Sequence, residues 1–143
     1  MGRARSAAVI VVDTSALIAI AFDEPERAAF ATAIRSASKA LISAPAVVES
    51  KLVAHSRGGQ RTVVLLDDLL RLPIFEVVPP EAAEIAAAYA AFVAFGKGSG
   101  HPAQLNFGDL FSYALAKVRG LPLLYKGDDF GHTDIRPAVA PAA

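Results

Sequence analysis

The sequence predicts a three-layer α/β/α sandwich with a central, mainly parallel sheet of four to five strands. Short apolar runs typical of strands alternate with longer helical segments, which is the pattern of parallel strands joined by helical crossovers. The first run, Val9–Val12, is β-branched throughout, so it predicts a strand buried on both faces. The chain has 143 residues, which is enough for one hydrophobic core.

Composition limits the classes of protein to consider. A hydrophobic fraction of 54% with 20% charged residues favours a globular domain over a disordered chain. The absence of cysteine excludes disulfides, thiolate metal sites and Cys nucleophiles, and makes a reducing cytoplasm the expected compartment. No apolar run approaches the roughly 20 residues that span a bilayer, so we expect no membrane association. The 14 basic and 14 acidic residues balance, which argues against a protein that coats nucleic acid but not against a nuclease.

The first half of the chain begins with the strand Val9–Val12, which ends at Asp13. Thr14 and Ser15 follow as natural N-caps for a short helix, Ser15–Phe22. The elements expected next are a helix from Pro25 to about Ser36, a strand at Ala40–Ser43, a helix at Ala46–Arg57 ended by Gly58 and Gly59, and a helix at about Gln60–Arg71.

The second half repeats the alternation of strand and helix. Its expected elements are a strand at Ile74–Val78, a helix at Glu81–Phe95, a helix at Phe107–Arg119 between Asn106 and Gly120, a strand at Leu121–Tyr125 and a brief edge strand near Thr133–Ile135. We expect a flexible extension over residues 1–8, one domain over 9–136 and a frayed Ala/Pro-rich tail over 137–143.

Asp13 and Glu49 are the first candidate site residues. Asp13 follows a strand of a parallel sheet, and ligands bind in the crevice beyond the carboxyl ends of such strands, although an Asp there can also be only a cap. Glu49 shares a helix face with the apolar Leu52 and Val53. A carboxylate on such a face requires a metal ion or a basic partner.

Further acidic residues follow later in the chain. Asp109 occupies the third helical position after Asn106, where a carboxylate stabilises the helix N-terminus, but its helix is otherwise apolar. Asp128 and Asp129 lie in a turn after the last predicted strand, so one of them can reach the same crevice as Asp13.

Together these residues predict a metal site. Two carboxylates ~4 Å apart repel by roughly 4 kcal/mol at an effective dielectric of about 20, so several can share a pocket only if protonated or bridged by a cation. Oxygen-only ligands suit Mg²⁺ or Mn²⁺. Such an ion can activate water for displacement at phosphorus.

Four segments in a fixed order carry a resemblance to a known family. They are VVDTSAL at residues 11–17, APAVVE at 44–49, LNFGDLFSYALA at 105–116, and KGDDF at 126–130 with TDI at 133–135. From about Val9 to Arg136 the chain resembles the PIN-domain ribonucleases, and more closely the VapC toxins of bacterial VapBC toxin–antitoxin pairs.

The resemblance implies a PIN-like fold and an Mg²⁺-dependent hydrolysis of RNA phosphodiester bonds. Asp13, Glu49 and Asp109 match the acidic metal-binding positions of the family. Asp13 and Asp109 would hold the metal, and Glu49 would position or help deprotonate the attacking water. Thr14 or Ser15 matches a supporting hydroxyl. Many members place the fourth acid where this chain has Gly127, and a variant turn places it at Asp129, which we prefer to Asp128. Candidates to neutralise substrate phosphates, each otherwise a solvated side chain, are Arg57, Lys97, His101 and Lys126.

The resemblance also implies partners. These are an RNA substrate, a second copy of the chain in a homodimer, and a VapB-type antitoxin whose C-terminal segment covers the active site. The apolar helices at Arg27–Ile34 and Val47–Leu72 are candidates for the antitoxin groove, although most of their apolar residues belong to the core.

Three other interpretations are weaker. A phosphoacceptor receiver domain needs an Asp after the middle strand, where this chain has Pro79 and Pro80. A haloacid-dehalogenase-type phosphatase needs a second Asp where this chain has Ser15. The remaining alternative is a catalytically inactive PIN-like scaffold that binds RNA or protein.

Overall fold

Four parallel strands form the central sheet of the computed structural model, which describes residues 8–140. The order across the sheet is β3-β2-β1-β4. The strands are β1 (Val9–Val12), β2 (Lys39–Ser43), β3 (Phe75–Val78) and β4 (Leu123–Leu124). At the centre of the sheet, Val11 pairs with Leu41 on one side and Leu123 on the other. The predicted α/β fold with a parallel sheet is confirmed.

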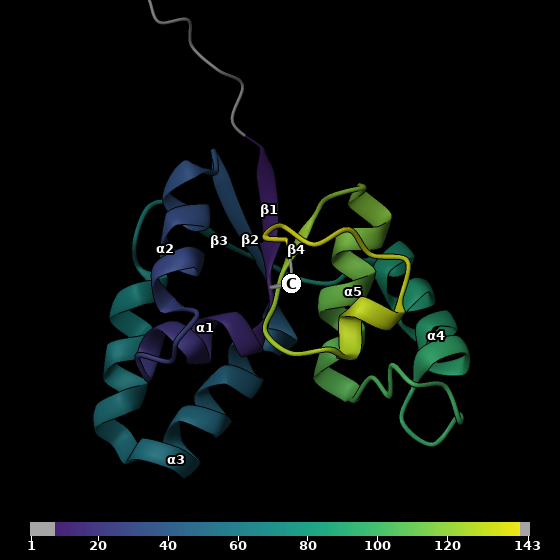
Figure 1. Ribbon diagram of the computed structural model, residues 1–143, viewed down its shortest axis with the longest axis horizontal. Coiled ribbons are helices and arrows are strands. Elements are labelled where there is room, and N and C mark those ends of the chain that lie inside the picture. Colours follow the sequence, from purple (N-terminus) through teal and green to yellow (C-terminus); the bar gives the residue numbers. More distant parts are fainter. Residues whose placement is uncertain (1–7, 141–143) are drawn as a thin grey trace, which may run out of the picture.

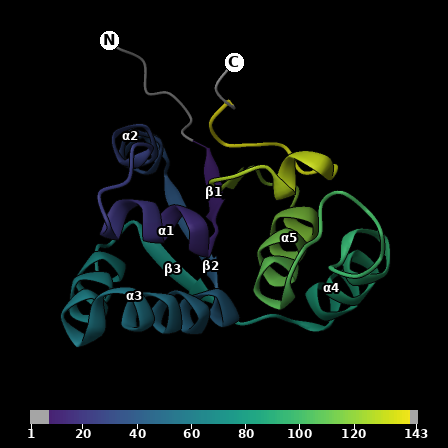
Figure 2. The same ribbon diagram turned by 60° about the horizontal axis from the view of Figure 1, so that its bottom comes forward.

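Five α-helices cover the two faces of the sheet. They are α1 (Thr14–Ala21), α2 (Arg27–Ser36), α3 (Ala44–Leu70), α4 (Ala82–Phe95) and α5 (Phe107–Arg119). Helices α1, α2 and α3 lie on one side and α4 and α5 on the other (Figures 1 and 2). No helix within residues 8–140 combines the length and the apolar character that crossing a bilayer requires.

Strand β1 separates two apolar cores, as its β-branched sequence predicts. Ile10 and Val12 pack in the core shared with α1, α2 and α3, while Val11 packs in the core shared with α4 and α5. Val11 and Val12 have no exposed surface. Because alternate side chains point to opposite faces, a strand apolar at every position suits this central place.

The last strand is shorter than predicted. Only Leu123 and Leu124 of the predicted Leu121–Tyr125 belong to β4. The backbone N–H of Lys126 donates to the Ser15 side chain instead of to a neighbouring strand (3.0 Å). The chain thus leaves the sheet at its carboxyl end and turns toward α1.

The prediction of an edge strand near Thr133–Ile135 is wrong. A 3₁₀ helix, η1 (Asp129–His132), precedes that segment. The Thr133 hydroxyl donates to the Phe130 carbonyl and accepts from the Ile135 N–H, so local side-chain bonds replace strand pairing there. Within the described residues, the chain after η1 pairs with β4 only at one isolated bridge, between Leu123 and Pro137.

Several helix boundaries also differ from the sequence prediction, and α2 begins at Arg27 rather than at Pro25. The N-cap of α1 is Asp13, whose carboxylate accepts from the Ser15 N–H, and Thr14 is the first helical residue. The two helices predicted around Gly58 and Gly59 join in α3 without a loop. Gly59 alone has non-helical angles (φ 72°, ψ −169°), which kink the helix at that point.

Both ends of the described chain are held to the sheet. The Ala8 carbonyl accepts from the Ser38 N–H (3.0 Å), while the rest of the predicted extension lies outside the described residues. Within residues 137–140 of the tail predicted to be frayed, the Ala138 N–H donates to the Leu123 carbonyl (2.8 Å) and Val139 packs on the core. Residues 141–143 of the predicted tail also lie outside the described part.

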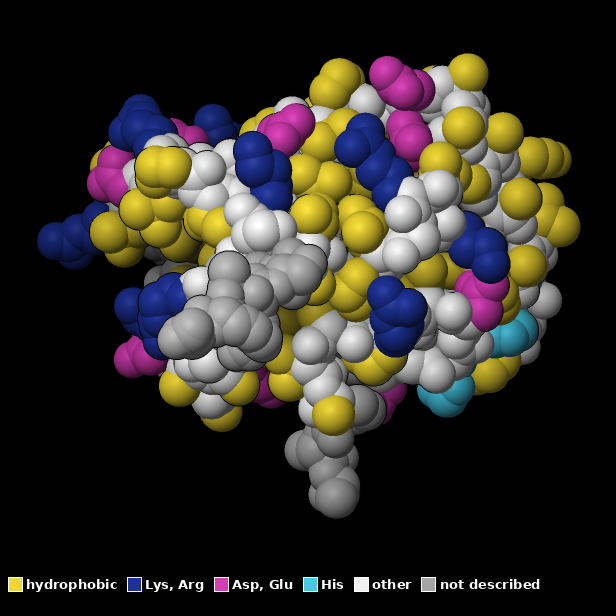
Figure 3. Space-filling view, turned by 90° about the horizontal axis from the view of Figure 1, so that it is seen from above, with side chains coloured by type: hydrophobic (Ala, Val, Ile, Leu, Met, Phe, Trp, Pro, Cys, Tyr) yellow, Lys and Arg dark blue, Asp and Glu magenta, His cyan; other side chains and the backbone are white. Residues whose placement is uncertain are grey.

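Charged side chains are mixed at the amino ends of the strands. Figure 3 looks onto this end of the molecule and shows acidic and basic side chains interspersed among apolar ones. The acidic residues singled out from the sequence lie toward the opposite end of the sheet.

Candidate active site

Asp13 lies at the carboxyl end of β1 and is only 2% exposed. Its Oδ2 accepts from the Ser15 N–H (3.0 Å) and from the Ser15 hydroxyl (2.8 Å). Its Oδ1 is buried and has no hydrogen-bond partner within residues 8–140. A buried carboxylate oxygen without a donor is unfavourable, so this atom is suited to meet a cation.

Glu49 extends from α3 to the first turn of α5. A Cβ atom added at Gly108 would lie 2.0 Å from Glu49 Oε1 and 2.3 Å from its Cδ. Glycine at position 108 therefore leaves the space that the carboxylate occupies. Burial raises the pKa of Glu49, the nearby Thr14 hydroxyl lowers it, and the charge of Asp13 raises it further.

The other acidic residues of the site affect the pKa of Asp109. Burial and the charge of Asp13 raise the pKa of Asp109 to about 7, with further contributions from Glu49 and Asp129. The Asn106 N–H, which donates to Asp109 Oδ2 (3.0 Å), acts in the opposite direction. Asp109 is thus both part of the capping box of α5 and the neighbour of three other carboxylates.

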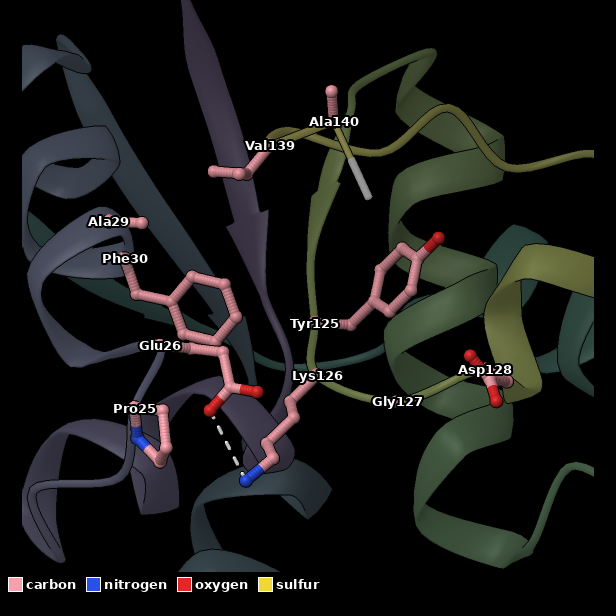
Figure 4. Close-up of a pocket in the computed structure, with 10 residues that line it drawn as sticks. All are labelled: Pro25, Glu26, Ala29, Phe30, Tyr125, Lys126, Gly127, Asp128, Val139 and Ala140. Carbon is pink, nitrogen blue, oxygen red and sulfur yellow. Dashed lines mark ion pairs between the residues drawn. The ribbon is translucent and has the colours of Figure 1, made fainter. Parts of the chain in front are cut away.

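Asp128 and Asp129 point to different surroundings. Both are exposed, and Asp129 is the first residue of η1. The charge of Asp129 acts on Asp109, whereas burial and then the charge of Asp128 raise the pKa of Tyr125. Asp128 lines a separate cavity together with Tyr125 and Lys126 (Figure 4).

The two hydroxyl residues after Asp13 have different tasks. The Ser15 hydroxyl donates to Asp13 and accepts from the Lys126 N–H, so it links α1 to the loop after β4. The Thr14 hydroxyl donates to the Ala46 carbonyl (3.1 Å) and accepts from the buried Ser50 (3.3 Å). Thr14 therefore fixes α1 against α3.

The predicted phosphate-neutralising residues have varied environments. Lys126 forms ion pairs with Glu24 (2.9 Å) and Glu26 (3.2 Å), and Arg57 pairs with Glu24 (3.2 Å). Lys126 and Arg57 therefore form ion pairs, with side chains that stay 34% and 47% exposed. The remaining candidates are Lys97, which is exposed, and His101, whose Nδ1 accepts from the Ala103 N–H.

The donor set fits a hard divalent cation in kind. The atoms available are carboxylate and hydroxyl oxygens, which Mg²⁺ and Mn²⁺ prefer. The unpartnered Oδ1 of Asp13 and the raised pKa of Asp109 both reflect negative charge gathered in a partly buried place. Within the described part of the chain, no three Asp, Glu or His side chains are arranged as a ready metal-binding group.

Sequence reasoning gave no role to Gly108 or Ser50. Gly108 carried a usable signal, because a glycine inside the first turn of a helix is unfavourable unless another group approaches closely. Ser50 carried none, since its role depends on how α3 packs on α1.

The whole chain was compared with known proteins. The family model described as PIN domain matches residues 10–136. The chain belongs to the PIN domain family. Within this family it is 45% identical over 130 residues to Ribonuclease VapC28 of Mycobacterium tuberculosis, with 91% of this chain and 98% of that protein covered. It is also 43% identical over 129 residues to Ribonuclease VapC42 of the same species, with 90% and 98% covered.

Solved structures share the PIN fold. The Mycobacterium tuberculosis VapC20 structure, described as a Sarcin-Ricin loop cleaving toxin, has a TM-score of 0.70 at 20% identity, with 90% of this chain and 99% of that chain covered. VapBC2 from Rickettsia felis, bound to a promoter DNA fragment, gives 0.69 at 12% identity, with 90% and 96% covered. A toxin–antitoxin complex from Klebsiella pneumoniae gives 0.58 at 20% identity, with 85% and 89% covered.

Proposed function

We propose that this PIN domain is a VapC-type ribonuclease, an Mg²⁺-dependent hydrolase of RNA phosphodiester bonds that acts as the toxin of a type II toxin–antitoxin pair. The observation that carries the proposal is the arrangement of the acidic residues: Glu49 lies against Gly108 at the start of α5, next to Asp109, and the buried Oδ1 of Asp13 has no partner within residues 8–140. Burial and the charges of Asp13, Glu49 and Asp129 raise the pKa of Asp109 to about 7, which agrees with this arrangement. Asp13 stands between β1 and α1, and the other three acids come from α3, α5 and η1. The similarity to proteins named VapC ribonucleases supports the same activity.

Each acid has a distinct role in this proposal. Asp13 and Asp109 would hold the cation, and the buried Oδ1 of Asp13, which has no partner within residues 8–140, is the oxygen available for it. Glu49 contributes to the same site and positions or deprotonates the attacking water, and its raised pKa suits a group that accepts a proton. Asp129, an exposed residue whose charge acts on Asp109, would be the fourth acid.

Mg²⁺, or Mn²⁺ in its place, would supply water activation and charge neutralisation at the phosphate. Ser15 and Thr14 hold the acidic residues in place. Ser15 fixes one oxygen of Asp13 with two hydrogen bonds, which leaves the other oxygen in a defined direction. Thr14 anchors the start of α1 to α3, the helix that carries Glu49. Such supporting bonds determine ligand orientation.

The activity is tested with purified protein and RNA in Mg²⁺ and in EDTA, beside an Asp13→Asn variant. We expect cleavage by the wild type in Mg²⁺, none in EDTA, and a loss of about a hundredfold or more in the variant. Equal cleavage by both proteins would contradict the proposed site. No cleavage of any RNA would favour the catalytically inactive scaffold. That alternative gives no reason for four acidic residues to lie near one another.

We propose a VapB-type antitoxin as the protein partner. An apolar groove of about 570 Å³ borders Glu49, and its lining includes Val48, Leu52 and Phe107. These three side chains are 58%, 64% and 73% exposed, which is unusual for large apolar residues. An antitoxin segment in this groove would cover the acidic residues. Co-purification with the protein encoded beside this chain tests the assignment.

We also propose a homodimer. Ile85, Tyr89 and Val93 are exposed on one face of α4, at intervals of four residues. Such a stripe is typical of a helix face that another apolar surface covers. In the proposed homodimer, this face of α4 forms the contact between the two copies of the chain.

A further inference from the structure

Lys126 joins segments that are far apart in the sequence. Its Nζ lies 2.9 Å from Glu24 Oε1 and 3.2 Å from Glu26 Oε1, in the connection between α1 and α2. Glu24 is held in turn by Arg57 of α3 (3.2 Å). Figure 4 shows the Lys126 side chain reaching from the end of β4 to Glu26.

These ion pairs join the connection between α1 and α2 to the loop after β4, and the two segments border a common cavity. The cavity has a volume of about 540 Å³ and lies between residues 25–30 and residues 125–128, with Val139 and Ala140 also lining it. Within residues 8–140, no further hydrogen bond or ion pair joins residues 22–26 to residues 125–129. The Lys126 side chain is therefore the polar contact between this loop and the α1–α2 connection, in addition to the backbone bond to Ser15 and the burial of Phe130.

The Lys126–Glu24 pair is also partly shielded from water. The side chains of Lys126 and Glu24 are 34% and 19% exposed, less than those of most other ion pairs in the described residues. The hydrogen bond from Lys126 lowers the pKa of Glu24 below its usual range, so the carboxylate stays charged. Partial shielding makes an ion pair stronger than one on the open surface.

The backbone of the same residue reaches the acidic site. The Lys126 N–H donates to the Ser15 hydroxyl (3.0 Å), which donates to Asp13 Oδ2 (2.8 Å). Gly127 follows with a φ of 96°, and the chain then enters η1 at Asp129. Lys126 is thus linked through Ser15 to Asp13, and it stands three residues before Asp129.

We propose that Lys126 is a positioning residue of the acidic site: Glu24 and Glu26 hold its ammonium, and its backbone orients Asp13 through Ser15 and sets Asp129. The inference rests on the proposed ribonuclease function. It contrasts with a direct phosphate contact, because the ammonium is already shared by two carboxylates.

The test uses two changes at opposite ends of the ion pairs. Lys126→Met removes the charge and keeps most of the length of the side chain, and Lys126→Arg keeps the charge. A double variant, Glu24→Gln with Glu26→Gln, removes the partners and leaves Lys126 in place. Lys39→Met is the matched control, because Lys39 pairs with Glu76 (3.4 Å) at the other end of the sheet. Melting temperatures identify any variant that fails to fold.

Two quantities are measured: the affinity for Mn²⁺ without RNA, by calorimetry, and the kcat and KM for cleavage of a short RNA in Mg²⁺. We expect Lys126→Met to lower kcat and Mn²⁺ affinity about 10- to 100-fold each, with KM changed less than about threefold. Lys126→Arg should recover most of the loss, the double glutamate variant should match Lys126→Met, and Lys39→Met should behave as the wild type. The Mn²⁺ result separates positioning from charge alone, because removing a nearby positive charge would by itself increase cation affinity.

A raised KM with unchanged kcat and Mn²⁺ affinity would overturn the proposal in favour of a phosphate contact. Wild-type values for both Lys126→Met and the double variant would overturn it as well. If the wild type binds Mn²⁺ without cleaving RNA, the proposed function fails, and the Mn²⁺ affinities alone decide the role of Lys126. A wild type that binds no Mn²⁺ contradicts both.

Discussion

Gly108 determines how closely Glu49 approaches the start of α5. Replacing it with alanine would place a methyl group 2.0 Å from Glu49 Oε1, so the carboxylate must move. We expect Gly108→Ala to reduce single-turnover RNA cleavage about tenfold or more. The melting temperature should change little, because alanine also favours the helix by about 1 kcal/mol.

Gly131→Ala is the matched control for this experiment. A Cβ atom there would meet its nearest neighbour, the Tyr125 hydroxyl, at 3.8 Å, which is an ordinary contact. Equal cleavage by the wild type and Gly108→Ala would contradict a role for Glu49 in the reaction.

Asp109 predicts how stability changes with pH. Its pKa is about 7 in the folded chain and 3.8 as the reference value, so between these values the folded state binds the extra proton. Stability therefore falls as pH rises from about 4 to 7, and Glu49 acts in the same direction. In EDTA, we expect a higher melting temperature at pH 5 than at pH 8.

Asp109→Asn should flatten this pH dependence and raise the melting temperature at pH 8. Asparagine can still accept the Asn106 N–H with its side-chain oxygen, so the cap is retained. The same pH dependence in the variant and the wild type would show that Asp109 is not the titrating group.

At this scale, the residue types of the candidate site were predictable and their contacts were not. Asp13, Glu49 and Asp109 each stand in a local pattern that one sequence displays. Which of Asp128 and Asp129 faces Asp109 depends on η1, a turn that forms through local bonds after the sheet has ended. The ion pairs of Lys126 join residues about a hundred positions apart, beyond any local pattern.

Among the elements, α5 carries Asp109 in its first turn and is terminated by Gly120, its C-cap. Gly120 adopts a φ of 66°, and no atom would obstruct a Cβ there, so a substitution acts through the backbone alone. We expect Gly120→Ala to destabilise the protein by about 1 kcal/mol, a fall of roughly 3 °C in melting temperature. Gly120→Asn should lose less, because asparagine tolerates this conformation.

Cleavage of RNA is the second measurement for these variants. Gly120 lies at the opposite end of α5 from Asp109, so kcat should stay near the wild-type value at a temperature where both variants are folded. Unchanged stability in Gly120→Ala would contradict the role of the left-handed cap.

Elements with a strong periodic pattern were predicted well, and those determined by distant contacts were not. Helix α5 has its cap, its apolar face and its terminal glycine in the sequence, and its bounds match the prediction. Strand β4 ends early because Lys126 bonds to Ser15, a residue 111 positions away. The segment 133–135 is drawn from the sheet toward α5, where Tyr113 and Lys117 both donate to Asp134.

For the whole molecule, the exposed face of α4 predicts association. Tyr89 is 70% exposed in the centre of the stripe formed with Ile85 and Val93. We expect the wild type to sediment as a dimer and Tyr89→Glu to sediment as a monomer, because a buried charge without a partner is unfavourable. A monomeric wild type at micromolar concentration would contradict the proposed homodimer.

The acidic site itself is tested most directly by calorimetric titration with Mn²⁺ at pH 7, in buffers of different ionisation enthalpy. Because the pKa of Asp109 is about 7, cation binding should release about half a proton from this carboxyl at pH 7 and almost none at pH 8.5. Asp109→Asn should bind Mn²⁺ more weakly and lose most of the release. No binding by the wild type, or the same proton release in the wild type and Asp109→Asn, would contradict a cation site built on these carboxylates.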